Sequence, residues 1–270
     1  MSLDMNSCSK PQHKSEEEEQ EAVIIGCRKS ELALVQTRSI ASQLGQTLDP
    51  SPNFQIATGS VVGDADKQAP FAVLSKLAGG SDIGKSLWTN GLEVDLVAGK
   101  VHCLVHCLKD MPTTLPPHCL LGAIPERENC LDAVLGQGAL GIEVSTDRPD
   151  MLELVRHVDH KPSRWRGLAE RAMLRSLQGG CSSPIGVWSS LEPLKEENGS
   201  TEETQRGRDG SGGGGSLSLR ATVVNIEGTS EIVAEDVATV QCDEEAEQLG
   251  VSVADMLIRK GARSLMPKQF

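Results

Sequence analysis

The sequence predicts an α/β fold, because segments with strand patterns and segments with helix patterns alternate along most of its 270 residues. The alternation begins with the apolar run AVIIG at residues 22–26 and a helical pattern directly after it. It ends with a predicted hairpin and a final helix. The number and order of these segments indicate two domains.

Residues 22–26 are predicted to form a short buried strand. The helix that follows is predicted from the helical spacing of Ala33, Thr37, Ile40 and Leu44.

The next strand is predicted over residues 101–108 and ends before Pro112, because a proline disfavours regular structure around it. A helix is expected over residues 164–178, with Ser163 as its N-cap and the glycines at 179–180 closing it.

Residues 185–188 are predicted to form the first strand of the second domain. Two alternating segments, residues 217–226 and 231–240, predict a hairpin with its turn at Gly228. The last helix is expected over residues 243–261. Its predicted inward-facing residues are Ala246, Leu249, Val253 and Leu257.

The composition excludes several classes of protein. A net charge of −12 gives no basic surface for nucleic acid, and three Phe, three Trp and no Tyr give few stacking platforms. No apolar run approaches the roughly 20 residues that cross a bilayer. The eight cysteines include no CxxC pair and are expected to be free thiols. We therefore expect a cytoplasmic protein with no nucleic-acid or membrane partner.

Two segments of low complexity interrupt the pattern. Residues 1–21 are expected to be a disordered acidic tail, because they offer little apolar surface to bury. Residues 195–216 are rich in Gly, Ser and Glu and are expected to be a flexible loop.

The first candidate site lies where the opening strand runs into its helix, in the sequence GCRKS at residues 26–30. A helix start brings backbone N–H groups together with Arg28 and Lys29, which suits a carboxylate or a phosphate. A surface helix start with ordinary basic residues fits the same pattern.

The second candidate is the pair Lys109 and Asp110, at the end of the strand over residues 101–108. Carboxylates at such strand ends often face a ligand crevice in α/β sheets, where they can stabilise a developing cation or handle a proton. The alternative is an aspartate that begins a turn before Pro112.

The third candidate is Cys181, which two glycines place on a loop after the helix over residues 164–178. A thiolate there could form a stable thioether, and the alternative is a small buried residue in a turn.

Three His-Cys pairs, at residues 102–103, 106–107 and 118–119, suggest zinc by composition. Strand alternation separates their ligands and the spacing is wrong, so no metal is predicted.

Six stretches of the sequence together resemble the porphobilinogen deaminase family, also called hydroxymethylbilane synthase, of tetrapyrrole and haem biosynthesis. They are GCRKSELALVQT (26–37), GKSLWTNGLE (84–93), LVHCLKDMPTTLPP (104–117), IPEREN (124–129), LGQGALGIEV (135–144) and LAERAMLRSLQGGCSSP (168–184). They occur in the family's order and cover most of the chain outside the acidic tail and the Gly-rich loop.

The resemblance implies a transferase that joins four porphobilinogen molecules head to tail, with loss of ammonia at each step. Growth would occur on a dipyrromethane cofactor held as a thioether, and Cys181 stands at the attachment position. Asp110 stands where the family has its catalytic carboxylate. Its charge would stabilise the positive pyrrole and azafulvene species that form as ammonia leaves.

Other matched positions would bind the carboxylates of the cofactor or substrate. Arg28, Ser30 and Lys109 match positions that bind acetate and propionate groups. Lys85 and Gln137 match family motifs and are assigned to the same cofactor-binding set.

The resemblance also implies the architecture. Residues 22–148 would form an open mixed-sheet α/β domain, like half of a periplasmic binding protein. Residues 149–270 would form a smaller α+β C-terminal domain with an antiparallel sheet, which carries the cofactor. The family resemblance implies a monomer whose ligand is porphobilinogen.

One part of the family pattern is missing. In the family, the stretch that matches residues 132–134 leads into a second domain whose arginines and hydroxyls clamp the substrate carboxylates. Here Gly136 follows almost at once, so the second domain is expected to be excised near residues 134–136. Cys107 also replaces the serine of the family block. Two hypotheses stay open: a hydroxymethylbilane synthase, or a non-catalytic remnant or exon-skipped product that binds a pyrrole or a protein partner.

Overall fold

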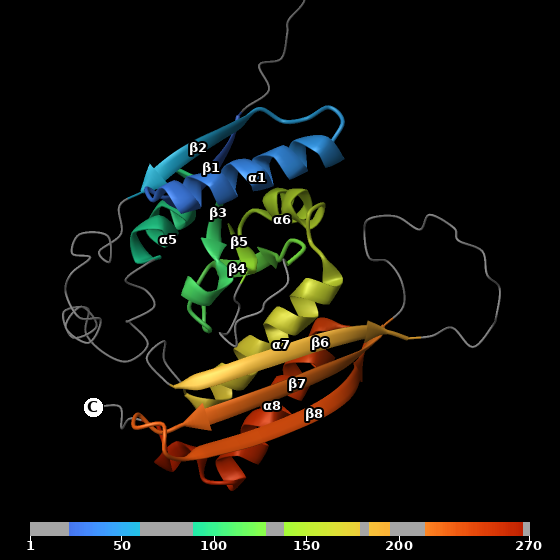
Figure 1. Ribbon diagram of the computed structural model, residues 1–270. Coiled ribbons are helices and arrows are strands. Elements are labelled where there is room, and N and C mark those ends of the chain that lie inside the picture. The colour runs from blue at the N-terminus through green and yellow to red at the C-terminus, as the bar shows by residue number, and fades with distance from the viewer. Residues whose placement is uncertain (1–21, 60–88, 128–137, 179–183, 195–213, 267–270) are drawn as a thin grey trace, which may run out of the picture.

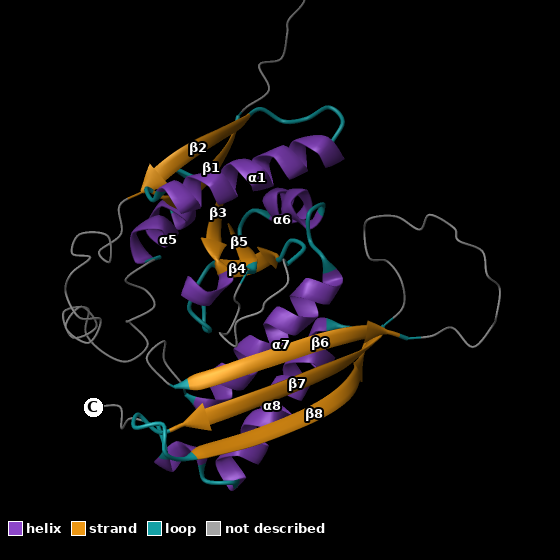
Figure 2. Cartoon of the chain, viewed as in Figure 1, coloured by secondary structure: helices purple, strands orange, loops and turns teal. Residues whose placement is uncertain are grey.

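The computed structural model describes residues 22–59, 89–127, 138–178, 184–194 and 214–266. These residues form two sheets with helices packed on them, as Figures 1 and 2 show. The predicted α/β fold class is therefore confirmed. The predicted tail at residues 1–21 lies outside the described residues.

The first sheet has five strands in the order β2-β1-β3-β5-β4. Its strands are β1 (Val23–Arg28), β2 (Phe54–Gly59), β3 (Cys103–Cys107), β4 (Cys119–Ala123) and β5 (Leu140–Ser145). Strand β1 runs parallel to β2 and β3, whereas β5 is antiparallel to β3 and β4, so the sheet is mixed as predicted.

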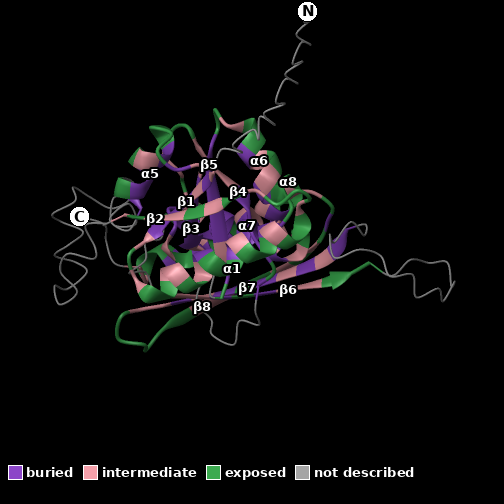
Figure 3. Cartoon of the chain, turned by 90° about the horizontal axis from the view of Figure 1, so that it is seen from above, coloured by how far each residue is buried: buried purple, intermediate pink, exposed green. Residues whose placement is uncertain are grey.

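Helices cover both faces of this sheet. On one face, α1 (Glu31–Thr47) and α6 (Pro149–Arg156) pack against the strands through a shared apolar cluster. On the other face, α5 (Asn90–Val97) packs against β3, with Leu92 and Leu96 against Leu104. Figure 3 shows exposed and intermediate residues along the outer face of α1, while strands β1, β3 and β5 of this sheet are mostly buried.

The second sheet is antiparallel, in the order β6-β7-β8. Its strands are β6 (Ile185–Pro193), β7 (Gly215–Val224) and β8 (Glu231–Val240). Helices α7 (Lys161–Leu177) and α8 (Asp243–Arg259) pack on each other and on this sheet. Figure 1 shows α7 running from the first sheet to the second.

Several predicted elements are confirmed with small shifts. Strand β1 continues to Arg28, two residues beyond the predicted end. The strand predicted over residues 101–108 is β3, and its last predicted residue begins a short 3₁₀ turn, Leu108–Asp110. The hairpin is confirmed, and Gly228 has a φ of 69°, a left-handed conformation that glycine adopts without strain.

Two predictions are wrong in detail. Helix α7 begins at Lys161 with His160 as its N-cap, so Ser163 lies inside the helix. Pro162 explains the earlier start, because proline fits the first turn of a helix, where its missing N–H costs nothing. The predicted loop over residues 195–216 ends earlier than expected, because Gly215 and Ser216 pair with both neighbouring strands.

Candidate active site

The first part of the site is the start of α1. Strand β1 ends at Arg28, and Ser30 is the N-cap of α1, with its Oγ accepting a hydrogen bond from the Ala33 N–H at 3.3 Å. The first backbone N–H groups of a helix have no partner inside the helix, and they carry its positive end. The turn between β1 and the N-terminus of α1 is therefore a place where an anion can bind.

The second part is the 3₁₀ turn Leu108–Asp110, which follows β3. Leu108 is 1% exposed and its N–H donates to the Ala139 carbonyl at 2.9 Å, which anchors the turn to the chain just before β5. Gly141 lets the turn approach closely, because a Cβ at this position would collide with Met111 Sδ. Lys109 is exposed and Asp110 is half-buried beside this apolar anchor.

The sheet topology brings these two parts together. Strands β1 and β3 are parallel neighbours, so their carboxyl ends lie at the same edge of the sheet. Arg28 Nη1 lies 3.6 Å from Asp110 Oδ2, and the two side chains are 22% and 33% exposed. The pair is therefore an ion pair at the surface of a hollow, open to a ligand.

A cavity of about 280 Å³ lies at this edge. Its lining includes the predicted site residues Arg28, Ser30, Lys109 and Asp110. The other predicted site residues, Lys85, Gln137 and Cys181, lie outside the described residues.

The other residues that line the cavity were not predicted as site residues; they are Leu32, Ala33, Gln36, Val105, His106 and Cys107. Cys107 Sγ donates to Gln36 Oε1 at 3.4 Å, which ties the end of β3 to α1. Strand alternation places Cys107 on the α1 face of the sheet. The alternation could be read from the sequence, but the sequence does not show that α1 is the helix that covers this face.

The charges of the cavity suit a ligand that carries carboxylates and develops positive charge. Arg28 and Lys109 supply cations beside the positive end of α1. Asp110 supplies one carboxylate, which can stabilise a cation formed close to it. Ser30 Oγ accepts the capping hydrogen bond, and its O–H can still donate to a ligand carboxylate.

The histidines of the three His-Cys pairs have separate partners. His102 Nδ1 accepts a hydrogen bond from the Ile24 N–H at 3.0 Å, and His106 Nε2 lies 3.4 Å from Glu143 Oε2. His118 is exposed, 3.8 Å from Asp147. Within the described part of the chain, no three His, Cys, Asp or Glu side chains are grouped as metal ligands.

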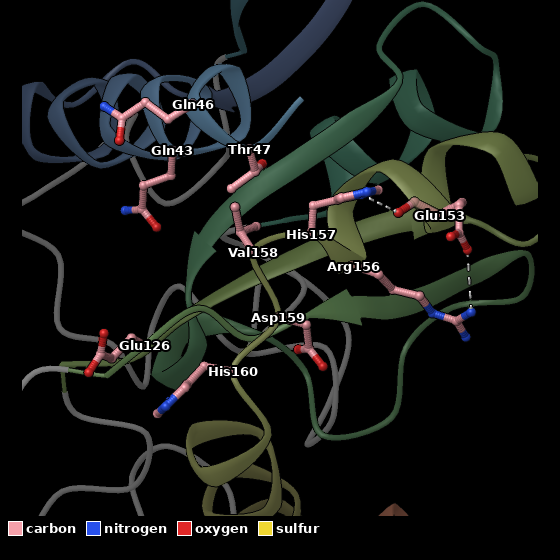
Figure 4. A pocket seen from close by; sticks show the side chains of 10 residues that line it. All are labelled: Gln43, Gln46, Thr47, Glu126, Glu153, Arg156, His157, Val158, Asp159 and His160. Carbon is pink, nitrogen blue, oxygen red and sulfur yellow. Dashed lines mark hydrogen bonds and ion pairs between the residues drawn. The ribbon is translucent and has the colours of Figure 1, made fainter. Parts of the chain in front are cut away.

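Figure 4 shows a larger cavity, of about 780 Å³, between the end of α1 and the segment from α6 to α7. Its lining contains the carboxylates of Glu126, Glu153 and Asp159, and its Arg156 lies 3.9 Å from Glu153. A ligand with carboxylates would be repelled there. None of the predicted site residues lines this cavity.

No helix in the described ranges has both the length and the apolar character needed to span a membrane.

Comparison with known proteins identifies related sequences over most of the chain. Residues 23–137 match the family model "Porphobilinogen deaminase, dipyromethane cofactor binding domain", and residues 165–259 match "Porphobilinogen deaminase, C-terminal domain". The cavity residues Arg28, Ser30, Lys109 and Asp110 fall within the first match, and Cys181 falls within the second.

Similar whole proteins carry the same name. The chain is 27% identical to porphobilinogen deaminase of Synechococcus elongatus over 336 positions, covering 91% of this chain and 95% of that protein. It is 26% identical to the Neurospora crassa protein, covering 92% and 94%, and 28% identical to the Yarrowia lipolytica protein, covering 90% and 92%. Each alignment is longer than the 270 residues of this chain, so each relative has positions that this chain lacks.

Proposed function

Because this chain belongs to the porphobilinogen deaminase family, we propose that it joins porphobilinogen units with loss of ammonia, using the cavity around Asp110. The observation that carries the proposal is the meeting of Arg28 and Asp110, at 3.6 Å, in one cavity with Lys109. The product of the full reaction would be hydroxymethylbilane, from four porphobilinogen molecules.

The donor set fits the dipyrromethane cofactor of the family. That group carries acetate and propionate carboxylates, and the cavity offers Arg28, Lys109 and the positive end of α1. When bound, the cofactor supplies the pyrrole carbon on which new units are added. We assign its covalent attachment to Cys181, and carboxylate binding to Arg28, Ser30 and Lys109 together with Lys85 and Gln137.

Arg28 and Asp110 would then act one after the other. A substrate carboxylate competes with Asp110 for the Arg28 guanidinium, because two carboxylates cannot both hold one cation at full strength. Asp110 is thereby turned towards the positive charge that develops on the pyrrole as ammonia leaves. A fixed carboxylate at that point lowers the energy of the transition state.

A second candidate function follows from the positions that this chain lacks. Each porphobilinogen brings two carboxylates, and the growing product brings more, so cations must be supplied in proportion. The excision near residues 134–136 removes the family's further arginines. A chain without them would be a family remnant that binds a pyrrole without turnover. Under either reading, we infer a cytoplasmic monomer with porphobilinogen as its ligand.

Turnover separates the two candidates. Purified protein is incubated with porphobilinogen, and both porphobilinogen loss and ammonia release are followed. We expect one ammonia per porphobilinogen consumed, and a loss of about 10²–10³-fold in rate in Asp110→Asn. The matched control is Asp95→Asn, which removes an exposed carboxylate paired with Lys100 at 2.8 Å. If the folded wild-type protein consumes no porphobilinogen, the transferase proposal fails and the non-catalytic family remnant is supported.

A further inference from the structure

Helix α7 carries two arginines, one helical turn apart, that reach the chain just beyond the 3₁₀ turn. Arg171 Nη1 donates a hydrogen bond to the Met111 carbonyl at 3.4 Å, and its Nη2 donates to the Pro112 carbonyl at 2.5 Å. Arg175 Nη1 donates to the Thr113 carbonyl at 3.3 Å. Residues four apart lie on the same face of a helix, so one face of α7 holds three consecutive carbonyls. The mechanism proposed above uses neither arginine.

These carbonyls lie in a stretch that needs donors from outside. Met111 and Pro112 are both buried, and neither lies in a helix or a strand. Proline has no N–H, so this stretch cannot pair continuously with a neighbouring strand. A buried carbonyl is costly without a partner, and a charged donor makes a stronger hydrogen bond than a neutral one. Arg171 is therefore well suited to fix these two peptide groups.

The two arginines differ in burial. Arg171 is 4% exposed, so packing fixes its guanidinium in place. Burial lowers the pKa of this guanidinium to about 10, which leaves it positively charged at neutral pH. The Arg175 side chain is 40% exposed and also lies 3.3 Å from Glu247 on α8. Arg171 is thus the inner member of the contact and Arg175 the outer one.

The contact fixes the far end of the turn that carries Asp110. Met111 follows Asp110 directly in the chain, and its N–H donates to the Leu108 carbonyl at 3.3 Å. Its carbonyl accepts from α7, so both peptide groups of Met111 are held. At the near end, the Leu108 N–H donates to the Ala139 carbonyl at 2.9 Å. The turn is therefore anchored on both sides of Asp110.

We propose that Arg171 is a positioning residue, which holds the two carbonyls after the turn and so sets where Asp110 stands against Arg28. Arg175 supports the same stretch from its exposed side. A displacement of about 1 Å at a reacting group can cost on the order of 10²-fold in rate, so a contact outside the cavity can control turnover. The catalytic meaning of this placement rests on the proposed function, whereas the hold on the chain does not.

The first test is amide hydrogen exchange of Met111, measured on the full chain. Arg171→Lys keeps a positive charge but loses the fork, because one ammonium group cannot replace two fixed donors. We expect the Met111 amide of this variant to exchange at least about tenfold faster than in the wild-type protein. Arg175→Gln changes an exposed side chain, so it tests the same contact if Arg171→Lys does not fold. Met111 exchange should also rise in that variant, by a smaller factor.

The matched control is Arg164→Lys, on the same helix. Arg164 Nε donates to Asp243 Oδ2 at 2.7 Å, and its Nη1 donates to the Gly122 carbonyl at 3.4 Å. It therefore joins α7 to the first sheet away from the turn. Its replacement should leave Met111 exchange unchanged, even where it lowers the stability of the protein.

The second test separates positioning from stability. With porphobilinogen as substrate, Arg171→Lys should lower kcat by about tenfold or more, with little change in KM. In an Asp110→Asn background the same replacement should lower kcat little further, because a positioning residue acts through the group that it places. A residue that only stabilised the fold would lower kcat by the same factor in both backgrounds.

Unchanged Met111 exchange in Arg171→Lys, or in Arg175→Gln if the first variant does not fold, would overturn the proposal. An equal rise in Arg164→Lys would also overturn it, because it would indicate general loosening of α7. So would an equal fall in kcat in the two backgrounds. If Met111 exchange rises as expected while the wild-type protein consumes no porphobilinogen, the hold on the chain stands and the proposed function fails.

Discussion

Arg28 Nη1 and Asp110 Oδ2 lie 3.6 Å apart, at the ends of two parallel neighbouring strands. The separation is longer than a charge-assisted hydrogen bond, and both side chains are partly exposed. An ion pair of this kind contributes little to stability, about 0–1 kcal/mol. Its position in a cavity with Lys109 gives it a different role, which is to hold a cation and a carboxylate ready for a ligand.

Replacing Arg28 should weaken ligand binding more than stability. Arg28→Gln removes the cation but keeps a polar side chain, so porphobilinogen should bind about 10- to 100-fold more weakly by calorimetry. The control is Arg38→Gln, an exposed arginine on α1 outside the cavity lining. Equal dissociation constants for Arg28→Gln and the wild-type protein would contradict the assignment.

Replacing Ser30 should destabilise the start of α1. Its Oγ accepts the capping hydrogen bond from the Ala33 N–H, so Ser30→Ala should lower the free energy of unfolding by about 1 kcal/mol. Ser39→Ala, inside the same helix, should have a smaller effect, because its exposed hydroxyl only accepts from Gln43. Urea unfolding measures both. A larger loss in Ser39→Ala would mean that the cap is unimportant.

Adding one methyl group behind the turn should disturb it. A Cβ at Gly141 would collide with Met111 Sδ and approach Leu108 Cδ1 to 3.2 Å, so Gly141→Ala should cost about 1–3 kcal/mol of stability. In Gly45→Ala, the new Cβ meets only the Ser51 side chain, at 3.1 Å, and stability should be unchanged or higher. Thermal unfolding distinguishes the two. Equal melting temperatures would show that the turn does not pack tightly on β5.

Alkaline pH should destabilise the fold through Cys103. Burial raises the pKa of this thiol from 9.0 to about 12, so the thiolate forms first in the unfolded chain. The stabilising effect of the thiol is present below pH 9 and is lost as the pH rises towards 12. Each such group contributes a slope of about 1.4 kcal/mol per pH unit in that window.

The check is urea unfolding at pH 8, 9 and 10 with reductant present. Cys103→Ala should have a shallower decline above pH 9 than the wild-type protein, whatever its stability at pH 8. The control Val105→Ala truncates a buried side chain on the same strand without removing a titratable group, and it should keep the wild-type slope. Parallel declines in all three proteins would refute the assignment.

The candidate residues could be found from the sequence one at a time, but their meeting could not. Arg28 and Asp110 each follow a pattern that predicts a strand end. Their proximity depends on the parallel pairing of β1 with β3. No local sequence pattern predicts which strands pair when many residues separate them along the chain. Family resemblance supplied that information where local patterns did not.

Ser163 illustrates why a strong local preference can mislead. Serine is a favoured N-cap, yet its Oγ here accepts a hydrogen bond from the Arg127 N–H at 2.8 Å, across 36 residues. Helix α7 therefore starts earlier, at Lys161. Glu143 shows the same limit, since a glutamate in a strand is usually exposed, whereas this one is 0% exposed and the strand pattern alone does not predict its burial.

The most direct test of the central claim is the intact mass of protein purified from cells that make tetrapyrrole precursors. We predict a mass increment of one dipyrromethane, which maps to the peptide that contains Cys181 and is absent from Cys181→Ser. Such a result would place the family's cofactor on this chain. A protein that melts cooperatively but has only the mass of its sequence would contradict the account.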